Sequence, residues 1–254
     1  RCFGIKPKET LSIAQELYTR GIISYPRTSS QQLPASIGYA KILRALSKNK
    51  KYAELCALLL KKKGLSPNNG RKTDPAHPAI YPTGISPKSI DDRPAKVYDL
   101  IVKRFMAAFG VHAVRETMTV IIDVKQEFFI AKGSRTVEKN WHVFYSPYVK
   151  LEESELPGLD KGNVIDIKKI LLHSKQTQPP KRYTPSSIIK ELEKRGLGTK
   201  ATRADIVETL YKRNYVKGEA LEATDLGMHI VGVLEKYCPK IIDEELTKKF
   251  EQDM

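Results

Sequence analysis

The sequence predicts an α+β protein with several domains, because the spacing of its apolar residues changes twice along the chain. Residues 1–112 have the spacing of amphipathic helices. Residues 113–180 contain short β-branched and aromatic runs separated by turn residues, a pattern typical of antiparallel strands. Residues 181–254 return to helical spacing. We therefore expect a helical domain, then a β arch or hinge, then a second helical domain.

Four helices are predicted in the first block. "ETLSIAQELYTRG" places apolar side chains on one face and ends at Gly21, a residue suited to a helix C-terminus. "KILRALSK" and "YAELCALLLKKK" are also amphipathic, and "DDRPAKVYDLIVKRFMAAFG" has aspartates before Pro94 in its first turn. Residues 41–63 hold eight Lys or Arg but one acid, Glu54. This basic run is either a solvated face or one that meets phosphate.

Four strands are predicted in the middle block, on "RETMTVIIDV", "EFFIAKGS", "NWHVFYS" and "NVIDIKKILLH". Their β-branched and aromatic residues favour a pleated, half-buried surface. A polar connection that contains proline, "SKQTQPPKR", leads from them to the third block.

The third block reads as helix, glycine turn, helix and hairpin, which is the outline of a winged helix-turn-helix. Thr184 can cap the first helix, "SSIIKELEKR", with Pro185 at its first position. "GLGTK" forms the turn, and "ATRADIVETLYKR" is the second helix, with Ile206, Val207 and Leu210 expected inward. "YVKGEALEAT" then reads as two short strands about a Lys-Gly turn.

The composition is that of a folded and strongly basic protein. Its 44 Lys and Arg exceed its 29 Asp and Glu, which gives a formal net charge of +15. A surplus of this size favours a polyanionic partner, most often nucleic acid. The three scattered cysteines form no Cys-x-x-Cys pair and suit a reducing compartment, so we expect a cytoplasmic protein. No apolar run approaches the roughly 20 residues of a membrane helix, and we expect no membrane association.

Tyr25, in "GIISYPRTSS", is a candidate nucleophile. The residue before a proline is extended, and in an extended segment residues two apart point the same way, so Tyr25 and Arg27 should project to one side. A phenol with a pKa near 10 needs help to attack. A guanidinium favours the phenolate and offers forked donors to a phosphate. Alternatively, Tyr25 packs at a helix–loop junction and Arg27 is solvated.

Two further segments offer groups for phosphate chemistry. His77, in the stiff loop "DPAHPAIYPTG", can donate to a phosphate oxygen or move a proton, although a loop histidine can equally be a plain surface residue. Asp74 can orient it, but only across irregular chain. "GLGTKAT" precedes a helix, where backbone amides bind phosphate. Its alternative is a glycine-capped turn without a ligand.

Together these pieces resemble the type IA DNA topoisomerases, most closely the archaeal members. The resemblance rests on four segments that occur in the same order as in the family: "LSIAQELYTRGIISYPRTSS", "DPAHPAIYPTG", "VYDLIVKRFMAAF" and "YTPSSIIKELEKRGLGTKATRADIVETLYKRNYV". The resemblance implies that Tyr25 attacks single-stranded DNA and leaves a 5′-phosphotyrosine, without ATP. It implies that Arg27 contacts the scissile phosphate and that His77 lies near the cleavage site. The DNA backbone would be met by Gly198, Lys200, Thr202 and Arg203.

Two departures from the family pattern qualify this reading. Thr199 stands where many bacterial members carry arginine, so that contact is absent or moved to Lys200 or Arg203. The clustered acidic motif of the family's N-terminal metal-binding domain has no counterpart, and "IDDRP" is not that pattern. We therefore expect a fragment of a monomeric, nucleoid-associated enzyme that holds no cofactor itself. Mg²⁺ would belong to the missing N-terminal domain, and the chain alone would bind DNA without cleaving it.

Two other readings of the sequence remain open. The chain can be a non-catalytic DNA-binding module built on the winged-helix-like segment, with Tyr25 purely structural. It can also be a tyrosine recombinase or type IB enzyme, which would link to a 3′-phosphate.

Overall fold

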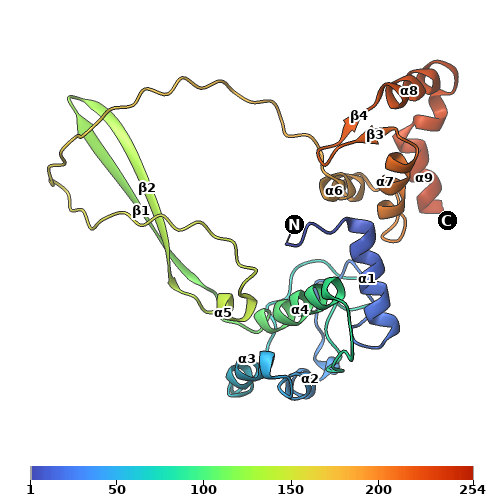
Figure 1. Cartoon of the computed structure of the whole chain (residues 1–254), viewed down its shortest axis with the longest axis horizontal. Helices are drawn as coiled ribbons and strands as arrows, with labels where there is room; N and C mark the ends of the chain where they lie inside the picture. Colours follow the sequence, from blue (N-terminus) through green and yellow to red (C-terminus); the bar gives the residue numbers. More distant parts are fainter. Residues whose placement is uncertain (1, 254) are drawn as a thin grey trace.

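A computed structural model describes residues 2–253, apart from the side chains of residues 252 and 253. Its first block is helical, as the sequence predicts, and lies in the lower right of Figure 1. It contains α1 (Pro7–Thr19), η1 (Ala35–Ile37), α2 (Tyr39–Leu46), α3 (Lys50–Leu60) and α4 (Asp92–Ala107). Helix α1 ends as expected at Gly21, whose φ of +68° suits a residue without a Cβ.

The main hydrophobic core lies inside this first block. All but two of the buried hydrophobic residues among those described lie between Ile13 and Phe109, the exceptions being Phe144 and Val207. The predicted inner faces are partly confirmed, since Leu17 is fully buried whereas Tyr18 is 40% exposed. Because this block has its own core, it forms a firm base for the segment that carries Tyr25.

Asp99 is a buried carboxylate that joins three parts of the chain. It accepts hydrogen bonds from the hydroxyls of Tyr52 (2.9 Å) and Tyr148 (2.5 Å) and pairs with Lys51 (2.9 Å). Burial raises the pKa of Asp99, but the hydrogen bonds from Tyr148, Lys51 and Tyr52 outweigh burial and hold that pKa below its usual value. The charge is thus kept inside the block by compensating donors.

The middle block contains one long hairpin, which extends away from the helices in Figure 1. Strands β1 (Val114–Val124) and β2 (Glu127–Glu138) pair antiparallel, which confirms the first two predicted strands. Lys125 and Gln126 make the tight turn with positive φ values of 52° and 71°. The tip exposes Phe128 and Ile130, which are 67% and 65% accessible.

The other two predicted strands of this block are wrong. "NWHVFYS" forms the short helix α5 (Trp141–Tyr145), because Phe144 turns inward onto α4 and joins the main core. A short aromatic segment can form either a helical turn or a strand, and its composition does not distinguish the two. The packing of its side chains determines which one forms. Residues 163–173 form no strand within the described chain and are exposed throughout. A strand needs a neighbour to hydrogen-bond, and this segment has none there.

The third block follows the predicted order of elements. It contains α6 (Pro185–Arg195), α7 (Arg203–Lys212), β3 (Val216–Lys217), β4 (Glu222–Ala223), α8 (Asp225–Tyr237), η2 (Pro239–Ile242) and α9 (Glu244–Asp253). The Thr184 side chain caps α6 with Pro185 at its first position, as expected. In α7, Val207 is buried as predicted and Leu210 is half-buried, but the prediction is wrong for Ile206, which is 42% exposed.

We predict that Asp99→Ala destabilises the fold by about 3–5 kcal/mol, because it leaves the Tyr52 and Tyr148 hydroxyls and the ammonium of Lys103 without their buried partner. Chemical denaturation measures the free energy of unfolding. Because the pKa of Asp99 is lowered on folding, its contribution is present above about pH 4 and declines as the pH falls through the folded-state pKa. Asp92→Asn, which breaks an exposed pair with Lys96, is the control and should change little. Equal losses in both variants would contradict a special role for Asp99.

Candidate active site

The segment that carries Tyr25 is fastened to the loop that carries His77. After Gly21 the chain runs extended, and Ile23 forms an antiparallel bridge with Pro82. The Ser24 amide donates to the Tyr81 carbonyl (2.9 Å), and the Tyr81 amide donates to the Ser24 hydroxyl (2.9 Å). Ile23 is 1% exposed, so its side chain anchors the segment in the core. The backbone at Tyr25 is therefore held on both sides before any ligand arrives.

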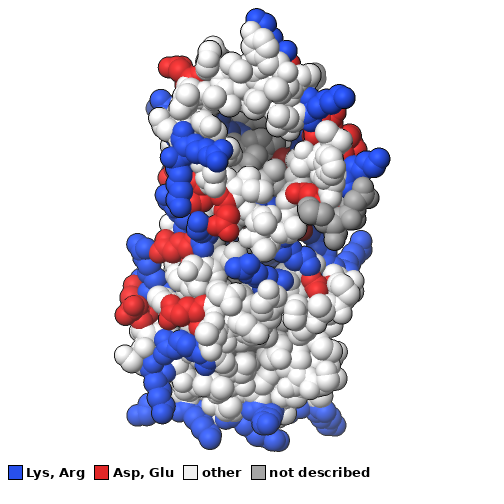
Figure 2. Space-filling view, turned by 90° about the vertical axis from the view of Figure 1, so that its right-hand side faces the viewer, with Lys and Arg blue, Asp and Glu red and all other residues white. Residues whose placement is uncertain are grey.

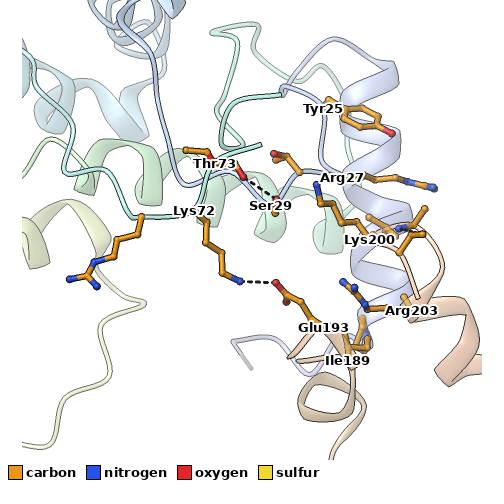
Figure 3. A pocket seen from close by; sticks show the side chains of 16 residues that line it. Tyr25, Arg27, Ser29, Lys72, Thr73, Ile189, Glu193, Lys200 and Arg203 are labelled. Atoms are coloured by element: carbon orange, nitrogen blue, oxygen red, sulfur yellow. Dashed lines mark hydrogen bonds and ion pairs between the residues drawn. The ribbon is translucent and has the colours of Figure 1, made fainter. Parts of the chain in front are cut away.

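Tyr25 and Arg27 point to the same side of this segment, as the proline between them predicts (Figure 3). The Tyr25 ring lies against Tyr18, with 5.3 Å between ring centroids, and against His77, at 4.5 Å. The Arg27 Nε is buried and has no hydrogen-bond partner within the described residues. A buried donor without an acceptor is costly, so this atom is suited to an acceptor from a ligand.

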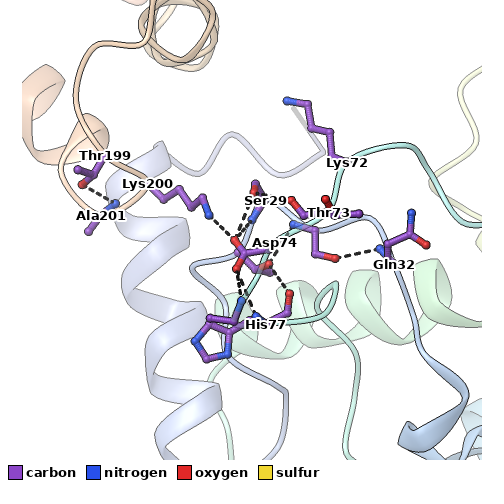
Figure 4. Close-up of polar contacts among 12 residues, drawn as sticks. Ser29, Gln32, Lys72, Thr73, Asp74, His77, Thr199, Lys200 and Ala201 are labelled. Atoms are coloured by element: carbon purple, nitrogen blue, oxygen red, sulfur yellow. Dashed lines mark hydrogen bonds and ion pairs between the residues drawn. The ribbon is translucent and has the colours of Figure 1, made fainter. Parts of the chain in front are cut away.

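Asp74 joins three separate segments at one carboxylate (Figure 4). It accepts hydrogen bonds from the amide and the hydroxyl of Ser29, at 3.3 and 3.2 Å, and from the amides of Ala76 (3.1 Å) and His77 (3.2 Å). Lys200 forms an ion pair with the same carboxylate, which is only 4% exposed. The bond from Lys200 and those from the Ala76 and Ser29 amides hold the pKa of Asp74 well below its usual value.

Asp74 does not orient the His77 imidazole, as sequence reasoning considered. It binds the backbone of the His77 loop instead, and the ring points away toward Tyr25. An aspartate side chain that accepts from the amides two and three residues later forms an Asx turn. This contact of Asp74 can therefore be predicted from the local sequence. The ion pair to Lys200 had no such signal.

Among the described residues, three ion pairs cross between the first and third blocks. Besides Lys200 with Asp74, Lys72 pairs with Glu193 on α6 at 2.7 Å. Lys8 on α1 pairs with Asp205 on α7 at 2.8 Å. The two exposed pairs, Lys72–Glu193 and Lys8–Asp205, contribute little stability each. Helix α1 also packs against α7, so the ion pairs are only a part of what joins the two blocks.

A cavity of about 1030 Å³ lies between these two blocks and contains the candidate nucleophile (Figure 3). The charged side chains that line it are mostly cationic. Its cations are Arg27, Arg71, Lys72, Lys200 and Arg203, and the one acid that lines it is Glu193. Tyr25, Arg27, Lys200 and Arg203 thus meet in one cavity, although Lys200 and Arg203 are far from Tyr25 in the sequence. Sequence reasoning missed Arg71, Lys72 and Glu193, which carry no motif.

Gly198 and Thr202 do not line the cavity, and their polar groups already have partners. The Gly198 amide donates to the Glu251 carboxylate (2.7 Å). The Thr202 hydroxyl accepts from the Thr199 amide (2.9 Å). Arg203 does line the cavity, and its Nε donates to the Leu197 carbonyl (2.8 Å). Glycine is needed at 198 because φ is +66° and a Cβ would crowd neighbouring side chains.

The described residues hold no group of three or more His, Cys, Asp or Glu side chains arranged to bind a metal ion. The carboxylates near Tyr25 are already paired with lysines. Across the same part of the chain, no helix is both long and apolar enough to cross a membrane.

Comparison with solved structures bears on the fold. The structure resembles full-length topoisomerase I from Thermotoga maritima with a TM-score of 0.68 and 23% sequence identity. The match covers 99% of this chain and 42% of that one. At this identity the likeness supports the fold alone.

Comparison of sequences bears on the family. A family model described as DNA topoisomerase matches residues 1–254. The chain is 46% identical to DNA topoisomerase 1 of Methanothermobacter thermautotrophicus and 48% identical to that of Methanocaldococcus jannaschii. These matches cover 100% and 99% of the chain, but 35% and 33% of the relatives. Human DNA topoisomerase 3-alpha is 33% identical over 93% of the chain and 24% of its own length. The chain thus spans about a third of its archaeal relatives, and it belongs to the type IA DNA topoisomerase family.

Proposed function

We propose that this chain supplies the nucleophile of a DNA strand-passage enzyme, with Tyr25 as the attacking residue. The observation that carries the proposal is the shared cavity, where Tyr25 and Arg27 open onto one cationic space. The orphaned Nε of Arg27 supports it, because a phosphate oxygen is the kind of acceptor that this donor lacks. The substrate that fits is a single strand of DNA, whose backbone can bend into the cavity.

The proposed step is a transesterification at phosphorus. The Tyr25 oxygen forms a bond to the phosphorus, and the bond from phosphorus to the 3′ oxygen breaks. The phenol gives up its proton and the departing 3′ oxygen takes one up. The product is a 5′-phosphotyrosine and a free 3′-hydroxyl, so the energy of the phosphodiester is kept and religation needs no ATP. Arg27 stabilises the negative charge that builds on the phosphate oxygens, and His77, whose ring lies tilted against the Tyr25 ring, is the candidate to move the proton.

Two parts of the proposal concern groups outside this chain. The residues here do not fit a metal site, so we propose that Mg²⁺ is held by an N-terminal domain of the same protein. We further propose that residues 1–112 form the tyrosine domain, 113–180 the hinge and 181–254 the wall of the DNA groove. The whole would act as a monomer on DNA in the cytoplasm, at the nucleoid.

Lys200 has a proposed role that depends on exchange of partners. In the free protein its ammonium is paired with Asp74. A phosphate of the entering strand would replace Asp74 as the partner of Lys200, while Arg203 meets the neighbouring phosphate. Asp74 then competes with the DNA phosphate for the Lys200 ammonium. In this proposal the Lys200–Asp74 pair lies where the DNA backbone enters the cavity.

We predict that Tyr25→Phe abolishes the covalent protein–DNA adduct, because the nucleophilic oxygen is removed while the ring contacts to Tyr18 and His77 remain. The full-length protein is mixed with end-labelled single-stranded DNA and Mg²⁺, denatured, and examined for a labelled protein band. Tyr18→Phe is the matched control and should keep the adduct.

The same experiment separates the alternative readings. A 5′-phosphotyrosine retains the 3′-end label, whereas a recombinase-like or type IB linkage retains the 5′-end label. An adduct that survives Tyr25→Phe would show that another residue is the nucleophile. An absence of any adduct in the unmodified protein would favour a DNA-binding module without catalysis.

We predict that Asp74→Asn raises the affinity for a short single strand several-fold at about 0.1 M salt, because it frees Lys200 for phosphate. Asparagine keeps an acceptor for the Ala76 and His77 amides, so the loop should stay in place. Fluorescence anisotropy with a labelled oligonucleotide measures the change. Lys200→Ala should weaken binding and should cancel the gain in the double variant.

Asp92→Asn is the control for this double-mutant cycle, since it removes the same charge and frees Lys96 on another surface. An equal gain in Asp92→Asn, or a gain that persists without Lys200, would show that the effect of Asp74 is only a change in net charge.

A further inference from the structure

A second basic surface lies on α2 and α3, at the end of the molecule opposite α6–α9 (Figure 1). We call it the α2–α3 surface. It consists of six exposed cations on these helices and their connections: Lys41, Arg44, Lys48, Lys50, Lys61 and Lys63. The lower edge of the molecule in Figure 2 is lined by such cations, with no acidic side chain between them. The cavity around Tyr25 includes none of the six.

Burial of the apolar side of each helix forces these cations outward. On α2, Ile42, Leu43 and Leu46 are at most 4% exposed, which leaves Lys41 and Arg44 on the opposite side. On α3, Cys56 and Leu59 are fully buried in the same core. The two helices pack against each other and onto the same core, so the backbone positions that carry these charges are fixed without a ligand.

These six cations have no ion-pair partner among the described residues, and the one acid between residues 41 and 63, the exposed Glu54 on α3, forms no ion pair with them. Two neighbouring lysines are engaged, since Lys51 pairs with Asp99 and the Lys62 ammonium donates to the Phe109 carbonyl (2.7 Å). Elsewhere, arginines of the hairpin and of α6 each bind two carboxylates. Like charges that have no partner repel one another. A polyanion that binds to them reduces this repulsion and releases its own counterions, which favours binding.

The surface is hollowed where the two helices meet the chain after α3. Lys41, Arg44 and Lys62 line a cavity of about 400 Å³ there, and none of its lining residues is acidic. The cationic lining suits a phosphate backbone.

The surface lacks the groups that read unpaired bases. Its two tyrosines, Tyr39 and Tyr52, are 8% and 3% exposed, and their hydroxyls bind the Leu33 carbonyl and Asp99. Single strands are generally held by exposed aromatic rings on which bases stack, whereas duplexes are held through their phosphates. We propose that the α2–α3 surface binds the backbone of a second DNA segment, double-stranded and without sequence preference. This inference rests on the proposed function only in taking DNA as the polyanion.

The test compares two triple variants of the full-length protein that remove the same charge. One is Lys41→Gln with Arg44→Gln and Lys48→Gln, on the α2–α3 surface. The control is Lys161→Gln with Lys168→Gln and Lys169→Gln, which are exposed in the middle block. The affinity for a 30-base-pair duplex is measured between about 50 and 200 mM salt. The surface variant should bind at least tenfold more weakly at low salt, with a salt slope shallower by about 2–3, and the control should lose much less.

Three results would overturn the inference: equal losses in both variants, an unchanged salt slope, or a variant that keeps duplex binding but loses binding to vesicles of anionic lipid. The last result would assign the surface to a membrane. All substituted side chains are exposed, and unchanged thermal unfolding would confirm that each variant folds. The Tyr25 adduct on a short single strand is measured in parallel. If the adduct forms but the surface variant binds the duplex as well as the control does, this inference is wrong and the proposed function stands. If no adduct forms but the surface variant binds the duplex more weakly than the control, the proposed function is wrong and this inference stands.

Discussion

The candidate site depends on one buried carboxylate, Asp74. Its side chain is 4% exposed and receives donors from the Ser29 segment, from the His77 loop and from Lys200. A carboxylate in such a place is costly unless each oxygen is matched by donors. Asp74 therefore fixes the relative position of three segments at once. It adds the contact with the turn before α7 to the bridge and hydrogen bonds that already fasten the Tyr25 segment to the His77 loop.

The same contact gives the site its means of opening. A network of backbone amides is permanent, but an ion pair to a surface lysine is exchangeable, since solvent and phosphate compete for it. The first block keeps its shape through its own core and through Asp99. The third block contacts it through three ion pairs among the described residues and through the packing of α1 against α7.

Much of the fold was predictable because local chemistry decides it. The Thr184 cap, the Pro185 start and the left-handed Gly196 define α6 wherever it packs. The errors lie where packing decides. "NWHVFYS" forms α5 because Phe144 packs into the main core. Residues 163–173 are exposed because no strand of the described chain lies beside them. The same division applies to the site, where the direction of Tyr25 and Arg27 followed from one proline but the partner of Lys200 did not.

The sequence by itself determined the family motifs, the helices with clear ends and the shared direction of Tyr25 and Arg27, because each depends on neighbours within a few residues. Only the tertiary structure decided that Lys200 meets Asp74 across 126 positions, that Gly198 and Thr202 are engaged by protein partners, and that six cations of the basic run after residue 40 are exposed while Lys51 and Lys62 are engaged. The reason is physical. Ion pairs between distant segments, and the exposure of a charge, depend on how whole blocks dock, and no local pattern of residues encodes that docking.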